Sequence, residues 1–300
     1  MRHLIFSSVL LFITLLACSS VVEKKALTDD DEIAKNNNSL LWSIEKDNHQ
    51  KSYIFGTMHL IEPEYYNFSD QLKQKIISAD KIIMEIGGEP NPIEAFNLMV
   101  LDSGRVEDYF TKEQLSQLIK FMDLKLNTSP KEFRQKYSKM KPFLILQAIT
   151  QAYFSDNAIS YDLNIMQLAK ENNKTIDGFE TMEEQLGFFE QIPNTEMANL
   201  IISSITNFDK EKKETLKLQK LYAKQKVDKL IPLMKKQSPE LMKYNDIFLT
   251  DRNEKWTPKI NSFTKTSKCF IAVGAAHLFG ENGILELLRK EGYILKPIKM

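Results

Sequence analysis

Two short apolar segments, one near each end of the chain, run into the same pattern of glycine, any two residues, and histidine. The first covers residues 52–59 and ends at His59, and the second covers 268–277 and ends at His277. Short apolar runs that stop at glycine are typical of buried strands. The glycine before each histidine predicts a turn with positive φ and a close approach of the backbone. The repetition predicts two related halves that build one mixed sheet surrounded by helices, an α/β fold.

Hydrophobic periodicity places further elements between these two segments. Strands are predicted at residues 40–45, 52–55, 81–86, 174–180, 268–273 and 293–298. Helices are predicted at 69–79, 112–122, 130–137, 142–154, 162–171 and 283–290, from 181 onward, and over much of 194–256. Ser69 is expected to cap the first helix, and Thr181 with Glu184 forms a capping box.

The first seventeen residues have the pattern of an export signal. Arg2 supplies a positive charge, residues 4–16 are mostly apolar, and Ala17 precedes Cys18. The spacing resembles a lipobox, so we expect cleavage before Cys18 and attachment of a lipid to its thiol. A transmembrane anchor is the alternative, but the apolar run is shorter than the ~20 residues that cross a bilayer.

This signal sets the expected organisation of the chain and its location. Residues 1–17 are the signal peptide, 18–38 the lipidated cysteine with a disordered polar tether, and 39–300 a single folded domain. The mature protein is therefore expected in the cell envelope, outside the cytoplasm, on the outer membrane or facing the periplasm. Its expected partners are the membrane, through the lipid on Cys18, and a peptide or protein substrate.

Charge and cysteine content exclude other classes. The chain has 40 Lys plus Arg and 40 Asp plus Glu, and loss of Arg2 with the signal leaves 39 basic residues against 40 acidic ones. This balance argues against a nucleic-acid partner, which favours a basic surface. Once Cys18 is lipidated, Cys269 is the remaining cysteine, and its apolar neighbours predict a packing role.

Ionisable residues follow several of the predicted strands. His59 and His277 follow two of them, Glu85 lies near the end of a third, and Glu180 ends a fourth. If these strands are parallel neighbours, the side chains meet at one edge of the sheet, where α/β proteins bind ligands. A hydrogen-bonded structural role is the alternative for each histidine. His49 lies in a polar turn and is expected to be solvated.

Two imidazoles with one or two carboxylates can hold a divalent first-row metal and leave positions open for water and substrate. We therefore predict a site for Mn²⁺, Co²⁺ or Zn²⁺ with His59, His277, Glu85 and Glu180 as ligands. Such an ion lowers the pKa of bound water and polarises a carbonyl. No His-Glu-x-x-His, Walker, dinucleotide-binding or Gly-x-Ser-x-Gly motif is present to indicate a different site.

An ordered set of motifs resembles the TraB/GumN family, to which the Tiki proteases are related. The motifs are Tyr53-Ile54-Phe55-Gly56-Thr57-Met58-His59, Met84-Glu85, Gly178-Phe179-Glu180-Thr181 with Gln185-Leu186, Arg252-Asn253 with Trp256, and Val273-Gly274-Ala275-Ala276-His277-Leu278. The resemblance extends over residues 40–298 and implies a mixed α/β fold with two related halves. Tiki proteins are metal-dependent proteases that act on secreted Wnt proteins, and other members are linked to the shutdown of peptide pheromones. By resemblance, their two histidines and glutamate correspond to His59, His277 and Glu85.

Three functions remain open from the sequence. The first is a metal-dependent hydrolase, specifically a peptidase, that acts on an extracytoplasmic peptide, with His59, His277, Glu85 and Arg252 as catalytic residues. In it, Glu85 binds the metal or acts as general base, and Arg252 binds an oxyanion or a substrate carboxylate. The second is a lipoprotein that binds and sequesters peptides without catalysis. The third is a metal-independent hydrolase of small esters in which His59 is the general base.

Some of these residues also have simpler interpretations. Arg252 could form a surface salt bridge on a helix that Pro258 ends. Trp256, one helical turn further on, is expected in the core. Glu180 could brace a neighbouring loop, and Asp162 is expected to be the N-cap of its helix.

Overall fold

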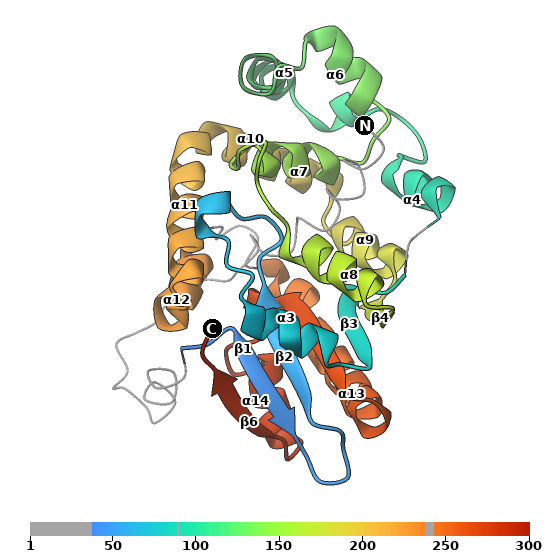
Figure 1. Ribbon diagram of the computed structural model, residues 1–300. Helices are drawn as coiled ribbons and strands as arrows, with labels where there is room; N and C mark the ends of the chain where they lie inside the picture. The colour runs from blue at the N-terminus through green and yellow to red at the C-terminus, as the bar shows by residue number, and fades with distance from the viewer. Residues whose placement is uncertain (1–37, 89–90, 238–242) are drawn as a thin grey trace. The chain divides into compact units, whose positions relative to one another are not determined.

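The computed structural model describes residues 38–88, 91–237 and 243–300 (Figure 1). The predicted signal peptide, Cys18 and nearly all of the predicted tether lie outside these residues. Within them, no helix combines the length and apolar character needed to cross a bilayer. The described strands form one six-stranded sheet in the order β4-β3-β5-β2-β1-β6. The strands are β1 (Leu41–Glu45), β2 (Ser52–Thr57), β3 (Lys81–Ile86), β4 (Thr175–Glu180), β5 (Cys269–Gly274) and β6 (Ile294–Ile298).

The sheet is mixed, as predicted: four neighbouring strands are parallel, and the strands at one side are antiparallel. β4, β3, β5 and β2 are parallel neighbours, whereas β1 pairs antiparallel with both β2 and β6. The two strands that precede the Gly-x-x-His turns, β2 and β5, pair directly with each other in the middle of the sheet. All four parallel strands therefore end at the same edge, which brings their following residues together.

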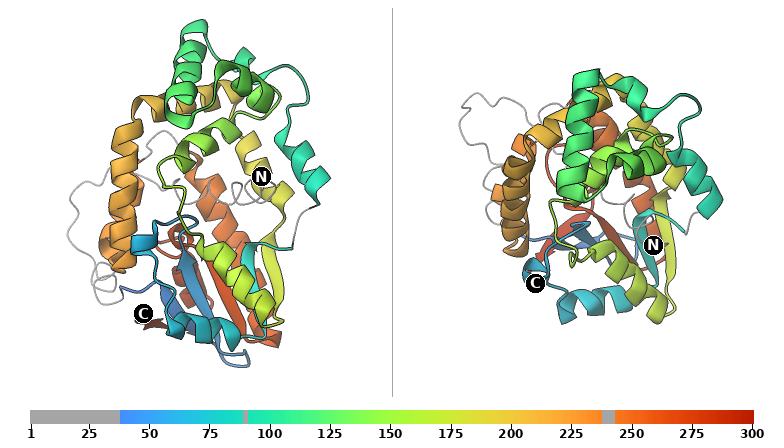
Figure 2. Two further views of the ribbon diagram at one scale, coloured as in Figure 1. Left: turned by 45° about the horizontal axis from the view of Figure 1, so that its top comes forward. Right: turned by 90° about the horizontal axis from the view of Figure 1, so that it is seen from above.

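Alternating side chains on these strands serve two separate cores. Phe55, Met84 and Phe270 pack on one face with helices α3, α8, α11 and α12. Ile54 and Ile271, each offset by one residue, pack on the other face with α13 and α14. Figure 2 shows α3 and α8 on one face of the sheet and α13 on the other. The helices are α3 (Asp70–Ile77), α8 (Tyr161–Glu171), α11 (Phe208–Ala223), α12 (Val227–Gln237), α13 (Asp251–Thr266) and α14 (Ile284–Lys290).

The described residues divide into two compact units, and each unit is discontinuous in sequence. The sheet unit contains residues 38–88, 157–180 and the described part of 216–300. The other unit contains residues 91–156 and 181–215 and is helical. Its helices are α4 (Pro92–Met99), α5 (Lys112–Leu126), α6 (Pro130–Tyr137), α7 (Phe143–Gln151), α9 (Met182–Glu190), α10 (Asn194–Thr206) and the start of α11. Every residue predicted for the site belongs to the sheet unit.

The caps read from the sequence are present. Ser69 accepts a hydrogen bond from the N–H of Leu72, and Thr181 with Glu184 forms the predicted capping box. The predicted helix end at Pro258 is wrong, because Pro258 lies inside α13, which continues to Thr266. A proline removes one backbone hydrogen bond. The helix continues past it because the side chains of Ile260 and Thr264 are buried, which offsets that loss.

The two glycines of the Gly-x-x-His turns do not have the positive φ that the sequence suggested. Gly274 has φ of −52°, and Gly56 is not among the described glycines with positive φ. The close approach, however, is present at Gly56, where a Cβ would lie 3.0 Å from the Cα of Ala275. A side chain at Gly56 would therefore push apart the two turns that carry the histidines.

A second close approach joins β3 to β4 and leads to a prediction. A Cβ at Gly178 would lie 1.9 Å from the backbone nitrogen of Gly87, whereas a Cβ at Gly187 in α9 would meet no atom within 4 Å. Gly178→Ala must separate these strands and is expected to cost more than about 2 kcal/mol of folding free energy. Gly187→Ala is the control, and it is expected to stabilise the protein by up to about 1 kcal/mol. Urea unfolding measures both, and equal stabilities would contradict the prediction.

Candidate active site

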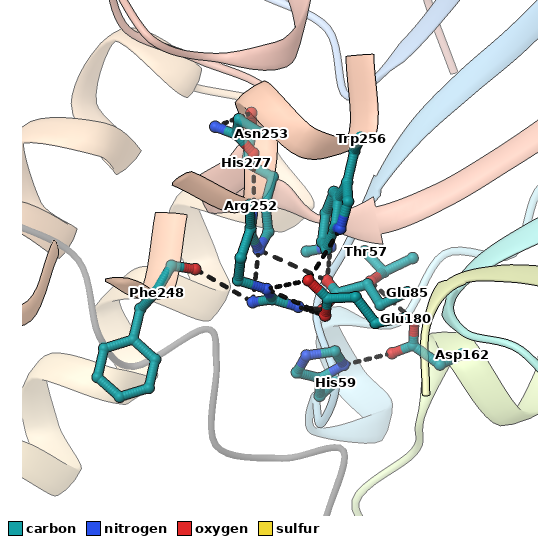
Figure 3. Close-up of polar contacts among 11 residues, drawn as sticks. Thr57, His59, Glu85, Asp162, Glu180, Phe248, Arg252, Asn253, Trp256 and His277 are labelled. Atoms are coloured by element: carbon teal, nitrogen blue, oxygen red, sulfur yellow. Dashed lines mark hydrogen bonds and ion pairs between the residues drawn. The ribbon is translucent and has the colours of Figure 1, made fainter. Parts of the chain in front are cut away.

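The carboxyl ends of the four parallel strands gather a buried polar cluster (Figure 3). His59 follows β2, Glu85 lies near the end of β3, and Glu180 ends β4. His277 lies on the 3-10 turn Ala275–His277 that follows β5. Arg252 reaches the same cluster from the first turn of α13. The structure thus brings together all five residues predicted for the site, and each is at most 8% exposed.

Arg252 is the centre of this cluster and is completely buried. Its Nε donates to both carboxylate oxygens of Glu180, at 3.0 and 3.1 Å. Nη2 donates to Glu180 and to Glu85, each at 2.8 Å. Nη1 donates to the carbonyl of Phe248 at 3.1 Å and lies 3.2 Å from Nε2 of His277. All five N–H groups of the guanidinium are therefore used within the protein, and the surface salt bridge considered for Arg252 is wrong.

The segment before α13 explains how Arg252 obtains its backbone acceptor. Residues Asp246–Thr250 form a π-helical turn, in which the N–H of Asp251 bonds the carbonyl of Asp246. Phe248 lies in this turn, and its carbonyl accepts from Nη1 of Arg252 at 3.1 Å. The π turn is thus one of the features that orient the guanidinium.

Glu85 is held as a carboxylate. Burial favours the neutral acid and by itself would raise the pKa of Glu85. The Arg252 guanidinium, followed by His277 and His59, outweighs burial and lowers the pKa of this carboxyl to about 2. The backbone N–H of Gly274 also donates to Oε1 of Glu85 at 2.7 Å. Both oxygens of Glu85 therefore have donors.

Glu180 contacts the same guanidinium, but its pKa is shifted in the opposite direction to that of Glu85. Burial raises its pKa above the usual value, and the hydrogen bonds and charge of Arg252 offset that effect only in part. The indole Nε1 of Trp256 donates to Oε1 of Glu180 at 2.9 Å. The indole ring is fully buried, as predicted, and lies 4.5 Å from the guanidinium carbon of Arg252. Glu180 thus braces both Arg252 and Trp256.

His59 forms a buried dyad with Asp162. Its Nδ1 lies 2.6 Å from Oδ2 of Asp162, whose Oδ1 accepts from the hydroxyl of Thr57 at 3.0 Å. Burial lowers the pKa of His59, but the adjacent Asp162 carboxylate outweighs burial, so the pKa is raised above 6.5. The opposite ring nitrogen, Nε2, is buried and has no hydrogen-bond partner among the described residues. The carboxylate therefore fixes the ring so that Nε2 can accept a proton.

The predicted role of Asp162 as an N-cap is wrong. Ser160 caps α8 by accepting from the N–H of Leu163, and Asp162, in the first turn, points to His59 instead. Asp162 and His59 are 103 residues apart in sequence. No local pattern indicates such a pairing, and the unusual burial of an aspartate in a first turn is visible only in the fold.

His277 is held by Asn253 in a neutral state. Nδ1 of His277 lies 2.7 Å from Oδ1 of Asn253, whose amide nitrogen donates to the carbonyl of Asn282 at 2.8 Å. An amide oxygen only accepts, so Nδ1 carries the proton and Nε2 accepts from Arg252. Burial, partly opposed by Glu85, lowers the pKa of His277 to about 3. Its partner Asn253, though in a motif of the resemblance, was not predicted as a site residue.

The four side chains predicted as metal ligands do not fit a metal ion in this arrangement. Arg252 donates to both carboxylates, Glu85 and Glu180. It also donates to Nε2 of His277, which leaves only His59 with a ring nitrogen that has no described partner. In the described parts of the chain, no group of three or more His, Cys, Asp or Glu is placed to hold a metal ion. Metal binding stays a prediction, and the cation enclosed by these carboxylates is a guanidinium.

Comparisons with known proteins agree with the motifs. Two relatives are each called uncharacterized protein YbaP. The one from Shigella flexneri is 24% identical over 267 residues, which cover 83% of this chain and 97% of the relative. The one from Escherichia coli K12 is 24% identical over 242 residues, which cover 79% of this chain and 87% of the relative. No solved structure matches the chain. The sequence profile of the TraB/PrgY/gumN family matches residues 40–297, and the chain therefore belongs to the TraB/PrgY/gumN family.

Proposed function

We propose that this protein is a hydrolase of extracytoplasmic peptides in which His59, oriented by Asp162, is the general base. The observation that carries the proposal is the state of the His59 ring. Nδ1 is bonded to a buried carboxylate, and Nε2 is buried without a partner among the described residues. A nitrogen in this state is suited to remove a proton from water as the water attacks a carbonyl carbon.

The surrounding charges support this role. When His59 takes the proton, burial and the Arg252 guanidinium oppose the charged ring, but the carboxylates of Asp162 and Glu85 outweigh them, so the pKa of His59 is raised. The proton then passes to the leaving nitrogen as the carbon–nitrogen bond breaks, so the products are a carboxylic acid and an amine. In this proposal Arg252 holds Glu85 in place and is a positioning residue, because its N–H groups are already engaged.

The choice of a peptide substrate rests on the resemblance to the Tiki proteases and on the proposed export of the chain. Two observations would decide it with the full-length protein in detergent: cleavage of a quenched fluorescent peptide library, and cleavage of nitrophenyl esters. Both are measured before and after treatment with EDTA, alongside metal analysis. Peptide cleavage that survives EDTA supports the proposal.

The other results each point to a different function. If EDTA abolishes cleavage and Mn²⁺, Co²⁺ or Zn²⁺ restores it, the reaction depends on a metal ion and His59 is not the general base. Cleavage of esters alone would identify a small-ester hydrolase. Retention of peptides without cleavage of either probe would identify a binding lipoprotein.

The His59–Asp162 dyad predicts a particular pH dependence of hydrolysis. His59 accepts a proton only in its neutral form, so kcat/KM is expected to rise as pH increases through the pKa of His59. Because Asp162 raises that pKa, the midpoint should lie above 6.5. Asp162→Asn removes the charge, so the midpoint should move to lower pH and kcat should fall by roughly 10²-fold or more.

The control for this profile is Asp123→Asn, a change of the same kind at an exposed position on α5. It should leave the midpoint and the rate as in the parent. A parent midpoint at or below 6.5, or one that Asp162→Asn does not move, would contradict the assignment of His59 as the base.

We also propose that a lipid on Cys18 anchors the protein to the cell envelope. The support is the lipobox-like sequence, which lies outside the described residues. Cells grown with radioactive palmitate should label the parent and Cys269→Ala, because Cys269 is a buried core thiol. They should not label Cys18→Ala. Label in Cys18→Ala, or its absence from the parent, would rule out this anchor.

A further inference from the structure

Helix α11 binds both ends of the turn that carries His59 (the helix is labelled in Figure 1). The hydroxyl of Tyr222 donates to the carbonyl of Gly56 at 2.7 Å, three residues before His59. The N–H of Glu62, three residues after His59, donates to Oε1 of Gln219 at 2.7 Å. Two buried side chains one helical turn apart therefore hold residues 56–62 against α11.

Gln219 is completely buried, and only half of its amide is used. Because Oε1 accepts from a backbone N–H, the oxygen and nitrogen of this amide are assigned. The nitrogen, Nε2, carries two hydrogens and has no acceptor among the described residues. A buried donor without an acceptor destabilises the folded protein, so such a group calls for a specific explanation.

The position of Gln219 relative to His59 suggests that explanation. Its Oε1 is bonded to Glu62, and three residues of chain span at most about 11 Å. The segment 56–62 therefore has two buried polar atoms near it that lack described partners, Nε2 of His59 and Nε2 of Gln219. The first suits a proton acceptor, and the second is a donor. Hydrolysis of a peptide bond uses both kinds of group. A proton acceptor activates the water that attacks the carbonyl carbon, and a donor binds the oxygen of that carbonyl or of a neighbouring one.

We infer that Gln219 is a substrate-binding residue whose Nε2 donates a hydrogen bond to a peptide carbonyl oxygen of the substrate. This inference rests on the proposed function, because it places the carbonyl in the site where His59 acts. Gln219 then contributes to KM. The hydrogen bonds of Gln219 and Tyr222 position the turn that carries His59.

The direct experiment observes the Gln219 amide by NMR in the full-length protein. Its side-chain ¹⁵N–¹H resonances are assigned by their loss in Gln219→Glu. N-methylacetamide, the smallest secondary amide that models a peptide group, is then titrated into the parent and into His59→Asn. The Gln219 proton resonances should move downfield in both proteins, because the binding of a carbonyl does not require catalysis. Resonances that stay in place while the protein cleaves peptides would overturn the inference alone.

Kinetics supply an independent measurement. Gln219→Glu keeps an oxygen for the N–H of Glu62 but replaces the donor by an acceptor, and it should raise KM for the cleaved peptide roughly tenfold. Gln167→Glu, the same change at an exposed position on α8, should leave KM unchanged. Equal KM values in the two variants would overturn the inference. A shifted Gln219 resonance in a protein that cleaves nothing would instead overturn the proposed hydrolase and leave Gln219 as a carbonyl-binding residue.

Discussion

Arg252→Met is expected to remove about 3–5 kcal/mol from the free energy of unfolding. The substitution keeps most of the side-chain volume but removes a guanidinium that donates to two buried carboxylates, Glu85 and Glu180. These carboxylates are at most 8% exposed and would lose the guanidinium that offsets most of their buried negative charge. They must then bind protons or draw water into the core, and either change destabilises the fold. Urea unfolding followed by circular dichroism measures the loss.

Arg289→Met provides the matched control. Arg289 forms an ion pair with Glu286 on the surface of α14, at 3.1 Å, with more than a third of each side chain exposed. Water screens such a pair, so its removal should cost less than about 1 kcal/mol. Adding Glu180→Gln to Arg252→Met should recover part of the lost stability, because one unpaired charge disappears. Equal losses in the two arginine variants would show that the cluster contributes nothing beyond a surface pair.

His59→Asn is expected to lower the rate of peptide hydrolysis by about 10²–10⁴-fold. Asparagine can still donate to Asp162, but its amide nitrogen cannot accept a proton from water at neutral pH. Because Nε2 of His59 has no described partner, the substitution breaks no hydrogen bond on that side of the ring. The protein should therefore stay folded while kcat falls. Initial rates on the cleaved peptide, with the thermal unfolding temperature recorded in parallel, measure the two effects separately.

His49→Asn is the control for the loss of a histidine. His49 lies in the turn between β1 and β2, where its ring contacts the carbonyl of Asp47 and the side chain of Asn261. This variant should retain the rate of the parent. If His59→Asn kept more than a tenth of the parent rate, His59 would not be the base, and the proposed mechanism would fail.

The sequence by itself determined most of the strands and several helix caps of this protein. Burial alternates along the central strands as their apolar residues predicted, and Ser69 and Thr181 cap the helices that follow them. The two Gly-x-x-His turns and Glu85 also pointed to the edge of the sheet where the polar cluster lies. These features depend on residues within a few positions of each other, so a pattern in the sequence is sufficient to reveal them.

Only the tertiary structure decided which groups are partners. Strand order places β3 and β5 side by side, and that pairing brings the N–H of Gly274 to Glu85 across 189 residues of sequence. In the fold, Asp162 is the partner of His59 and not the helix cap that the sequence predicted. Arg252 lies between two carboxylates where the sequence predicted a metal ion. Spacing along a chain shows which side chains can reach one edge of a sheet. It does not show which atoms meet there, because each hydrogen bond depends on the packing of all the elements around it.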